Sequence, residues 1–259
     1  MSESHLLYEK DGAVARITIN REERRNALSP EAMSLFLQHL DTAEADDEVR
    51  VVLVTAKGQR AFCAGADLSS GMGSGSAEGM SAFRDFASTL KRLAGFPKPT
   101  VARVNGSCVA GGTGIMLACD VVYAVDTAKF GTPEVNVGLF PMMIGALIFR
   151  NAPRKKAMEM MLMGKTLTAP EALELGMITR FFPPDALDGA VEEALCLLAG
   201  KSPIGMRIGK SAFHKMADMP FEQALDFLSE KLAEVASTED AVEGITAYLQ
   251  KRPPVFKGK

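Results

Sequence analysis

Runs in which apolar residues alternate with polar ones, or stand together, divide the first half of the chain into β-strands. Residues 13–19 alternate in the way of a half-buried strand, whereas residues 50–55 are nearly all apolar and predict a buried one. Residues 100–104 and 121–125 continue the series of strands. The pattern therefore predicts several short strands at separate points along the chain.

A helix is predicted between the first two strands. Ser29 is a suitable N-cap because its hydroxyl can accept a hydrogen bond from a free amide, and Pro30 suits the first helical position. Apolar residues then fall on one helical face, at Met33, Phe36, Leu37 and Leu40. Repeated strand–helix units of this kind predict an α/β core.

Helices dominate the second half of the sequence. Thr168 and Glu171 have the spacing of a capping box, and Gly176 is a natural stop for the helix that follows. Ser237 with Asp240 predicts the N-cap of a later helix. Between them an apolar stripe recurs at helical spacing, at Phe221, Leu225, Leu228, Leu232 and Val235. We interpret this stripe as a core or subunit contact rather than a ligand site.

Composition and charge exclude several classes of protein. The 259 residues are 47% hydrophobic and 24% charged, as in a folded globular protein, and the net charge of −3 gives no general attraction to nucleic acid or anionic membranes. The N-terminal residues are unlike a signal or transit peptide, and no apolar run is long enough to span a bilayer. The four cysteines follow no pairing or metal-binding pattern, so we expect a soluble cytoplasmic protein with free thiols.

Two glycine-rich turns follow predicted strands. Residues 62–68 read FCAGADL, and residues 105–115 read NGSCVAGGTGI and lead into an apolar helix. Small side chains leave backbone amides open to a ligand, and Gly111 and Gly112 fall near the helix N-terminus, where free N–H groups favour negative charge. One amide from each turn could hold a single oxyanion, at about 3 kcal/mol for each donor. Tight turns without a chemical role are the alternative, and neither turn has a phosphate-binding motif.

Acid–base groups are few. His5, His39 and His214 are scattered, and neither a catalytic triad nor a metal-ligand cluster is present in the pattern. Glu134 differs because it lies in the largely apolar segment 130–141. Desolvation there would favour the neutral carboxyl and suit the residue to proton transfer. A solvated surface glutamate is the alternative interpretation.

Four motifs in order along nearly the whole chain resemble those of the crotonase, or enoyl-CoA hydratase/isomerase, superfamily. They are NAL at 26–28, AFCAGAD at 61–67, NG through AGG at 105–112 with CD at 119–120, and FGTPE at 130–134 with Gly138. The resemblance implies an α/β spiral of ββα units over residues 1–200, which holds the acyl-CoA site. Residues 201–259 would then form a helical region for trimerisation.

The resemblance also implies roles for individual residues. The backbone amides of Ala66 and Gly111 would hold the thioester oxygen while Glu134 transfers a proton. Contacts with the substrate and its coenzyme A are implied for Ala64, Asp67, Leu68, Gly112, Tyr248 and Lys251, the last two reaching the coenzyme A of a neighbouring subunit. We expect a homotrimer or homohexamer that acts on an acyl-CoA, with no cofactor beyond the coenzyme A of the substrate, no metal, and no nucleic acid or membrane partner.

One departure from the family pattern bears on the reaction. Typical hydratases use two glutamates to position water, and Gly114 stands where the first is found, while Glu134 matches the second. Family isomerases often retain only the second, and MMIGALIFR after Pro141 replaces a glycine-rich GxGGTQRL with an apolar wall that could exclude water. The sequence thus favours double-bond isomerisation. A 2-enoyl-CoA hydratase and a non-catalytic acyl-CoA-binding homologue are the alternatives.

Overall fold

The computed structural model describes residues 4–67 and 77–259, and it has the α/β architecture predicted from the sequence. The larger sheet has the strand order β1 (Leu6–Asp11), β2 (Val14–Ile19), β3 (Val51–Ala56), β5 (Thr100–Val104), β7 (Val121–Val125) and β10 (Arg180–Phe182). All neighbouring strands are parallel except β1 and β2. The predicted strands agree with β2, β3, β5 and β7 to within one residue at each end.

A second sheet lies beside the first and sets the position of the site. Its strands are β4 (Ala61–Cys63), β6 (Ser107–Val109), β8 (Lys129–Gly131) and β9 (Thr166–Thr168), of which the first three run parallel. Along the chain, a strand of the larger sheet is followed three times by one of the smaller sheet and then by a helix. This is the ββα repeat that the sequence resemblance implied. It brings the turns after β4, β6 and β8 to neighbouring positions.

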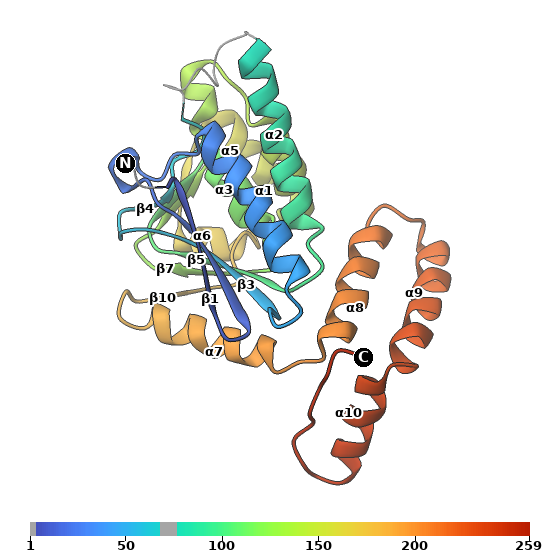
Figure 1. The fold of residues 1–259 in the computed structure, drawn as a ribbon. Helices are drawn as coiled ribbons and strands as arrows, with labels where there is room; N and C mark the ends of the chain where they lie inside the picture. The colour runs from blue at the N-terminus through green and yellow to red at the C-terminus, as the bar shows by residue number, and fades with distance from the viewer. Residues whose placement is uncertain (1–3, 68–76) are drawn as a thin grey trace.

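Longer helices that follow strands of the two sheets cover the core. α1 (Pro30–Ala45) lies alongside α2 (Ala77–Ala94) above the larger sheet, while α7 (Leu187–Ala199) packs against strands of that sheet (Figure 1). Ser29 caps α1 as predicted, since its hydroxyl accepts a hydrogen bond from the Ala32 amide at 3.1 Å. Residues 69–79 consist largely of glycine and other small residues, and this composition predicts a loop. Residues 69–76 lie outside the described residues, whereas α2 already begins at Ala77.

Shorter helices follow the smaller sheet: α3 (Gly111–Leu117), the 3₁₀ helix η3 (Pro133–Val137), α4 (Met142–Asn151), α5 (Arg154–Met163) and α6 (Ala169–Glu174). The predicted capping box at the start of α6 is present, with reciprocal hydrogen bonds between Thr168 and Glu171. Gly176 adopts the left-handed conformation just past the end of this helix, at φ 75°. Both local predictions are therefore confirmed.

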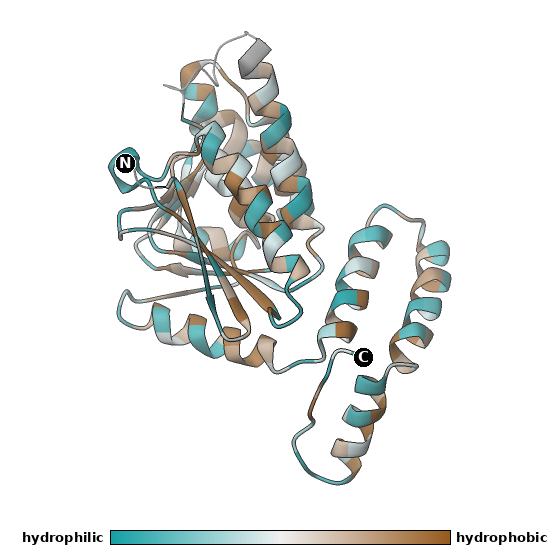
Figure 2. Ribbon diagram, in the orientation of Figure 1, coloured by the Kyte–Doolittle hydropathy of each residue, from teal (hydrophilic) through white to brown (hydrophobic). Residues whose placement is uncertain are grey.

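The last three helices extend from the core (Figure 1): α8 (Pro203–Met216), α9 (Phe221–Ala236) and α10 (Glu239–Leu249). Figure 2 shows hydrophobic segments on α8 and α10 as well as through the central strands. The apolar stripe on α9 is largely uncovered in the single chain, and Phe221 is 77% exposed. This exposure excludes a role in the core of the same chain, and the subunit contact stays a prediction.

The predicted N-cap at Ser237 was wrong by one residue. Thr238 caps α10, because its hydroxyl accepts a hydrogen bond from the Ala241 amide, while Ser237 closes α9. Asp240 is buried, and its carboxylate accepts hydrogen bonds from the amides of Lys257 and Gly258. The Asp240 carboxylate, which the sequence assigned to the start of the helix, thus binds the C-terminal segment instead.

An ion pair joins the C-terminal helices to the core. Lys210 of α8 donates to the Asp120 carboxylate at 2.5 Å and to the Lys98 carbonyl at 2.7 Å. The same carboxylate oxygen accepts from the amide and hydroxyl of Thr100, so Asp120 ties α8 to β5. The aspartate of the CD motif therefore has a structural role. Across the described chain, we find no helix with the length and apolarity needed to cross a bilayer.

Candidate active site

Asn26 anchors the start of β4, the strand that leads into the turn at residues 64–67, and is buried in the left-handed conformation at φ 56°. Its Oδ1 accepts a hydrogen bond from the Arg21 amide at 3.0 Å. Its Nδ2 donates to the Lys57 carbonyl at 3.0 Å and to the Ala61 carbonyl at 2.7 Å. Asparagine suits this position because it tolerates positive φ and carries both a donor and an acceptor.

We expect Asn26→Asp to destabilise the fold by about 2–4 kcal/mol, because the buried carboxylate makes neither donated hydrogen bond and faces two carbonyl oxygens. Chemical denaturation of the two proteins measures the change in the free energy of unfolding. Asn151→Asp is the matched control, since Nδ2 of that exposed residue makes one hydrogen bond, to the Leu147 carbonyl. Equal losses in both variants would contradict the role given to Asn26.

Asp67 braces the same turn from its other end. Its carboxylate accepts a hydrogen bond from Nη2 of Arg21 at 2.8 Å, and both side chains are about 10% exposed. Arg21 also donates through Nη1 to the Ala27 carbonyl at 2.6 Å. This geometry gives Asp67 a positioning role, and its direct contact with coenzyme A stays a prediction. The sequence offered no signal for Arg21, whose partner lies 46 residues away.

The amide of Ala66 stands out within this turn. The Gly65 amide donates to Cys63 Sγ at 3.4 Å, and the Asp67 amide donates to the Leu28 carbonyl at 2.9 Å. Between them, the Ala66 amide has no acceptor among residues 4–67 and 77–259. Because backbone donors inside a protein are nearly always paired, an open amide between two satisfied ones points to a ligand.

The turn after β6 repeats this arrangement. Ala110, held at the strained φ of 51°, donates its amide to the Gly131 carbonyl at 2.9 Å, and the Thr113 amide donates to the Ala110 carbonyl. The Gly111 amide lies at the first position of α3 and has no acceptor in the part of the chain that the structure describes. A second open donor is thus present at the start of the helix.

The two open amides border the same small space. A Cβ placed on Gly111 would lie 3.5 Å from the Ala66 nitrogen, and one on Gly65 would lie 3.1 Å from the Gly111 nitrogen. Gly65 has φ 94°, which only glycine adopts without strain. The structure therefore brings together the two predicted donors, and they can reach one oxygen atom.

Gly112 has a different role from its neighbour. A Cβ at this position would lie 2.5 Å from the Cys63 carbonyl oxygen, so the absence of a side chain lets α3 approach β4. This contact explains the glycine by packing alone. Direct binding of the substrate by Gly112 stays a prediction.

Glu134 lies in the first turn of η3, just after β8. The Gly131 carbonyl accepts from both the Ala110 amide and the Thr113 hydroxyl, which ties the end of β8 to the turn that carries Gly111. The carboxyl is partly buried, and Oε2 has no hydrogen-bond partner among the described residues. Burial raises the pKa of Glu134, while its own backbone amide lowers it by less. A carboxyl whose neutral form is favoured in this way is suited to taking and returning a proton.

Gly114 lies in the interior of α3 and is buried. A Cβ at this position would lie 2.5 Å from Cγ2 of Ile144 on α4, so the place of a side chain is already filled. The apolar wall predicted after Pro141 therefore does reach position 114. That Ile144 is the residue in contact was not visible in the sequence.

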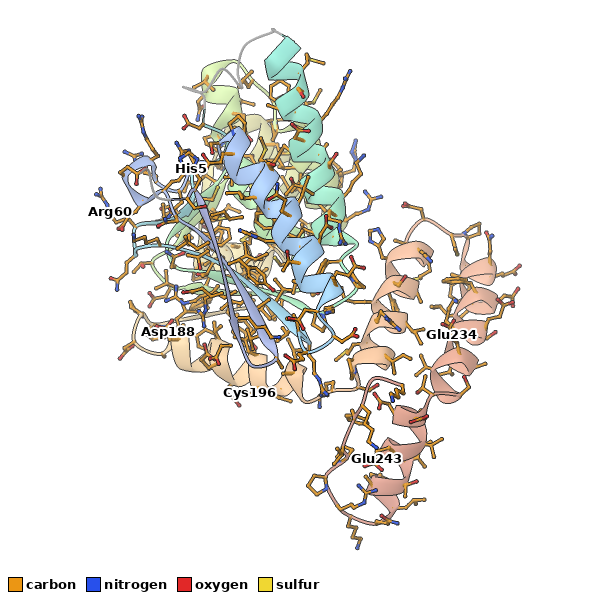
Figure 3. The ribbon with its side chains drawn as sticks, in the orientation of Figure 1. His5, Arg60, Asp188, Cys196, Glu234 and Glu243 are labelled. Carbon is orange, nitrogen blue, oxygen red and sulfur yellow. The ribbon has the colours of Figure 1, made fainter. Side chains whose placement is uncertain are left out.

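A cavity of about 810 Å³ borders the strand and turn that lead to Ala66. Arg25, Lys57 and Arg60 contribute positive charge to its lining, with Glu22 and Glu23 also present. Figure 3 shows Arg60 and His5 on the same side of the core. The predicted coenzyme A contact Ala64 does not itself line the cavity, but its amide donates at 3.1 Å to the carbonyl of Arg25, which does. A ligand would thus contact Ala64 through its carbonyl.

Of the remaining predicted contact residues, Leu68 lies outside the described residues. The other two are not brought to this region by the single chain. Tyr248, which is 83% exposed, lies on α10, and Lys251 follows that helix in the left-handed conformation at φ 54°. Figure 1 shows α10 outside the core, and the contact of these two side chains with the coenzyme A of a neighbouring subunit stays a prediction.

Metal and thiol chemistry find no support in the described residues. No group of three or more histidine, cysteine, aspartate or glutamate side chains there could hold a metal ion. Burial raises the pKa of the Cys63 thiol to about 12 and that of Cys108 far above its usual range. Both cysteines are neutral near pH 7 and are not nucleophiles.

Comparison with known proteins agrees with this geometry. The family model described as enoyl-CoA hydratase/isomerase matches residues 9–259. A putative enoyl-CoA hydratase of Thermus thermophilus is 38% identical over 95% of this chain and 98% of its own length. The 2,3-dehydroadipyl-CoA hydratase of Escherichia coli is 33% identical over 99% of this chain and all of its own. Among solved structures, an enoyl-CoA hydratase of Mycobacterium smegmatis matches with TM-score 0.94 and 32% identity, covering 98% of this chain and 99% of its own.

Proposed function

The chain belongs to the enoyl-CoA hydratase/isomerase family and has the crotonase fold, and we propose that it isomerises the double bond of an unsaturated acyl-CoA through a stabilised enolate. The observation that carries the proposal is the pair of open amides together with the partly buried Glu134, on the segment that follows β8. The filled space at Gly114 favours isomerisation over hydration, because it leaves no room for a second carboxylate.

In this mechanism the thioester oxygen accepts hydrogen bonds from the amides of Ala66 and Gly111. Negative charge moves onto that oxygen when the α-carbon loses a proton, so the two donors stabilise the enolate more than the bound substrate. Each donor of such an oxyanion hole contributes about 3 kcal/mol to lowering the barrier. The bracing of the Ala66 turn by Asn26 and Arg21 keeps its donor in place without reorganisation.

Glu134 moves the proton. With a 3-enoyl-CoA, its carboxylate takes a proton from C2, and the electrons of the C2–H bond pass into a dienolate that ends on the thioester oxygen. The resulting carboxylic acid then gives the proton to C4, and the double bond moves from C3–C4 to C2–C3. Atoms and charge balance with no further reactant, so one carboxyl suffices.

The basic cavity fits the nucleotide end of coenzyme A. Coenzyme A carries a diphosphate and a ribose phosphate, and Arg25, Lys57 and Arg60 offer cations to them, while Ala64 offers a carbonyl to the adenine amino group. In a homotrimer or homohexamer, Tyr248 and Lys251 would reach this end of the ligand from the adjacent subunit. The cytoplasmic location, and the lack of nucleic acid or membrane partners, stay predictions.

We expect the Arg25→Ala, Arg60→Ala double variant to raise KM for an acyl-CoA by about 10–100-fold, with the effect on KM rather than kcat, since two charge-assisted hydrogen bonds are removed far from the reacting atoms. Steady-state kinetics on an acyl-CoA and on the matching acyl-pantetheine measure the effect. The pantetheine thioester has no phosphates, so the variant and the wild type should act on it alike. Arg24→Ala is the control, because Arg24 is exposed on the same turn outside the cavity. A KM change shared by both thioesters would contradict this assignment.

The names of the relatives favour a second candidate, a 2-enoyl-CoA hydratase. Incubation with 3-hexenoyl-CoA and, separately, crotonyl-CoA distinguishes the two by mass spectrometry and by the absorbance of the conjugated enoyl group. We expect conversion of the 3-enoyl to the 2-enoyl thioester with no change in mass. Faster addition of water to crotonyl-CoA would establish the hydratase, and tight binding without turnover of either would establish a non-catalytic acyl-CoA-binding homologue.

A further inference from the structure

The helix face that carries the Gly111 amide continues into an apolar wall. Gly111 and Gly114 are three residues apart on α3 and so lie on one face of it, one above the other. Phe86 and Leu90 are four residues apart on α2 and likewise share one face of that helix. A Cβ on Gly111 would lie 3.3 Å from Phe86 Cζ, and a Cβ on Gly114 would lie 3.2 Å from Leu90 Cδ2. α2 and α3 therefore pack side by side. Leu90 lies beside Gly114, one helical turn along α3 from the oxyanion donor Gly111.

Ile144 closes this wall from the side of α4. Its Cγ2 lies 2.5 Å from the place of a Cβ on Gly114, closer than real atoms approach one another, so the isoleucine methyl occupies the space of a side chain there. Ile144 and Leu90 are 3% and 5% exposed. A β-branched side chain in a helix has one strongly preferred rotamer, so this methyl is held firmly. We call Leu90 and Ile144 together the apolar plug.

We propose that Ile144 is a specificity-determining residue, whose side chain keeps water from the space beside Gly114 and so commits the enolate to proton return. This inference rests on the proposed isomerase function and deepens it. A bound water needs room and two to four polar partners, and the plug offers methyl groups in their place. Hydration would need a water oxygen to bond to C3 while a proton goes to C2. Without an oriented water, the proton held by Glu134 returns to carbon.

The test compares Ile144→Ala with Ile148→Ala. Ile148 lies one turn further along α4 and is fully buried, so both changes remove the same atoms from the core, yet only the first opens the space at Gly114. For each variant we would measure the rate of hydration of crotonyl-CoA divided by the rate of isomerisation of 3-hexenoyl-CoA. We expect the ratio to rise at least about tenfold in Ile144→Ala, a 1.4 kcal/mol change in relative barrier heights, and to stay at the wild-type value in Ile148→Ala.

A second variant keeps the test decisive. Gly114→Glu alone should destabilise the fold, because its Cβ meets Ile144, whereas Gly114→Glu with Ile144→Ala should recover stability and raise the ratio beyond that of Ile144→Ala. A ratio that stays at the wild-type value in both Ile144 variants, or that moves equally in Ile148→Ala, would overturn the proposal.

Exchange of α-protons separates failure of this inference from failure of the proposed function. Butyryl-CoA is saturated, so its α-proton exchange in D₂O reports enolate formation and neither isomerisation nor hydration. No exchange by the wild type would overturn the enolate mechanism and the inference that rests on it. Exchange together with an unchanged ratio in the Ile144 variants would overturn the role of Ile144 and leave the enolate mechanism standing.

Discussion

Glu134→Gln is expected to lower isomerase turnover by about 10³–10⁴-fold while acyl-CoA affinity stays within a few-fold, since general acid–base catalysis contributes an effect of this size. Glutamine has nearly the same shape, so the loss is one of proton transfer rather than packing. No described side chain satisfies Oε2 of Glu134, which means that the substitution breaks no hydrogen bond that the fold needs there. Steady-state kinetics and calorimetric titration with a saturated acyl-CoA give the two quantities.

The pH dependence gives a second readout of the same group. Burial raises the pKa of Glu134 above its ordinary value of 4.5, and the carboxyl must be ionised to take a proton. The rate should therefore fall as the pH is lowered through that raised pKa, and this acid limb should be missing from the residual activity of Glu134→Gln. Glu230→Gln, a change of an exposed residue on α9, should keep both the rate and the limb. Undiminished turnover in Glu134→Gln would contradict the role of Glu134 in proton transfer.

The free energy of unfolding should depend on pH in the opposite direction from the rate. A carboxyl whose pKa is raised in the folded state binds more protons folded than unfolded, so the free energy of unfolding falls as pH rises from the unfolded pKa through the folded one. At neutral pH the glutamine variant escapes this penalty. Its free energy of unfolding should then equal or exceed that of the wild type, as expected where a catalytic group is kept at a cost to the fold.

Local signals account for the parts of the fold that the sequence predicted. The alternation in β2, the apolar run in β3, the N-cap at Ser29 and the capping box at Thr168 each depend on residues a few positions apart, and each was confirmed. The cap of α10 was misassigned because the C-terminal segment, distant in sequence, takes up Asp240. A tertiary contact of this kind leaves no mark on the local pattern.

The candidate site likewise has parts that the sequence predicted and parts that only the structure shows. Its glycine-rich turns and the apolar setting of Glu134 were visible in the sequence, and the family motifs supplied the choice of Ala66 and Gly111. The pairing of the Gly65, Asp67 and Ala110 amides, which helps to single out these two donors, required the structure. So did the pairing of Arg21 with Asp67 and the contact of Ile144 with Gly114, because each joins segments far apart in the chain.

Gly111→Ala is expected to reduce kcat/KM by about 10²–10³-fold, the usual effect of losing one oxyanion donor. The new methyl would lie 3.5 Å from the Ala66 nitrogen and 3.4 Å from the Gly65 Cα, in the space that the thioester oxygen needs. Gly111 does not have positive φ, so the backbone accepts alanine, and Phe86 need move only slightly to relieve its contact at 3.3 Å. Kinetics, α-proton exchange with butyryl-CoA and thermal unfolding measure the result.

Two further glycine substitutions separate this effect from packing. Gly209→Ala places its methyl where no atom lies within 4 Å, so activity should be unchanged, and the gain in helix propensity should stabilise α8 by up to about 1 kcal/mol. Gly112→Ala drives its methyl into the Cys63 carbonyl at 2.5 Å and should destabilise the fold by about 3 kcal/mol. If Gly111→Ala kept full exchange activity, the oxygen of the substrate would have to lie elsewhere. Loss of activity with a nearly unchanged melting temperature at Gly111, beside loss of stability at Gly112, would show that adjacent glycines of one turn serve catalysis and packing separately.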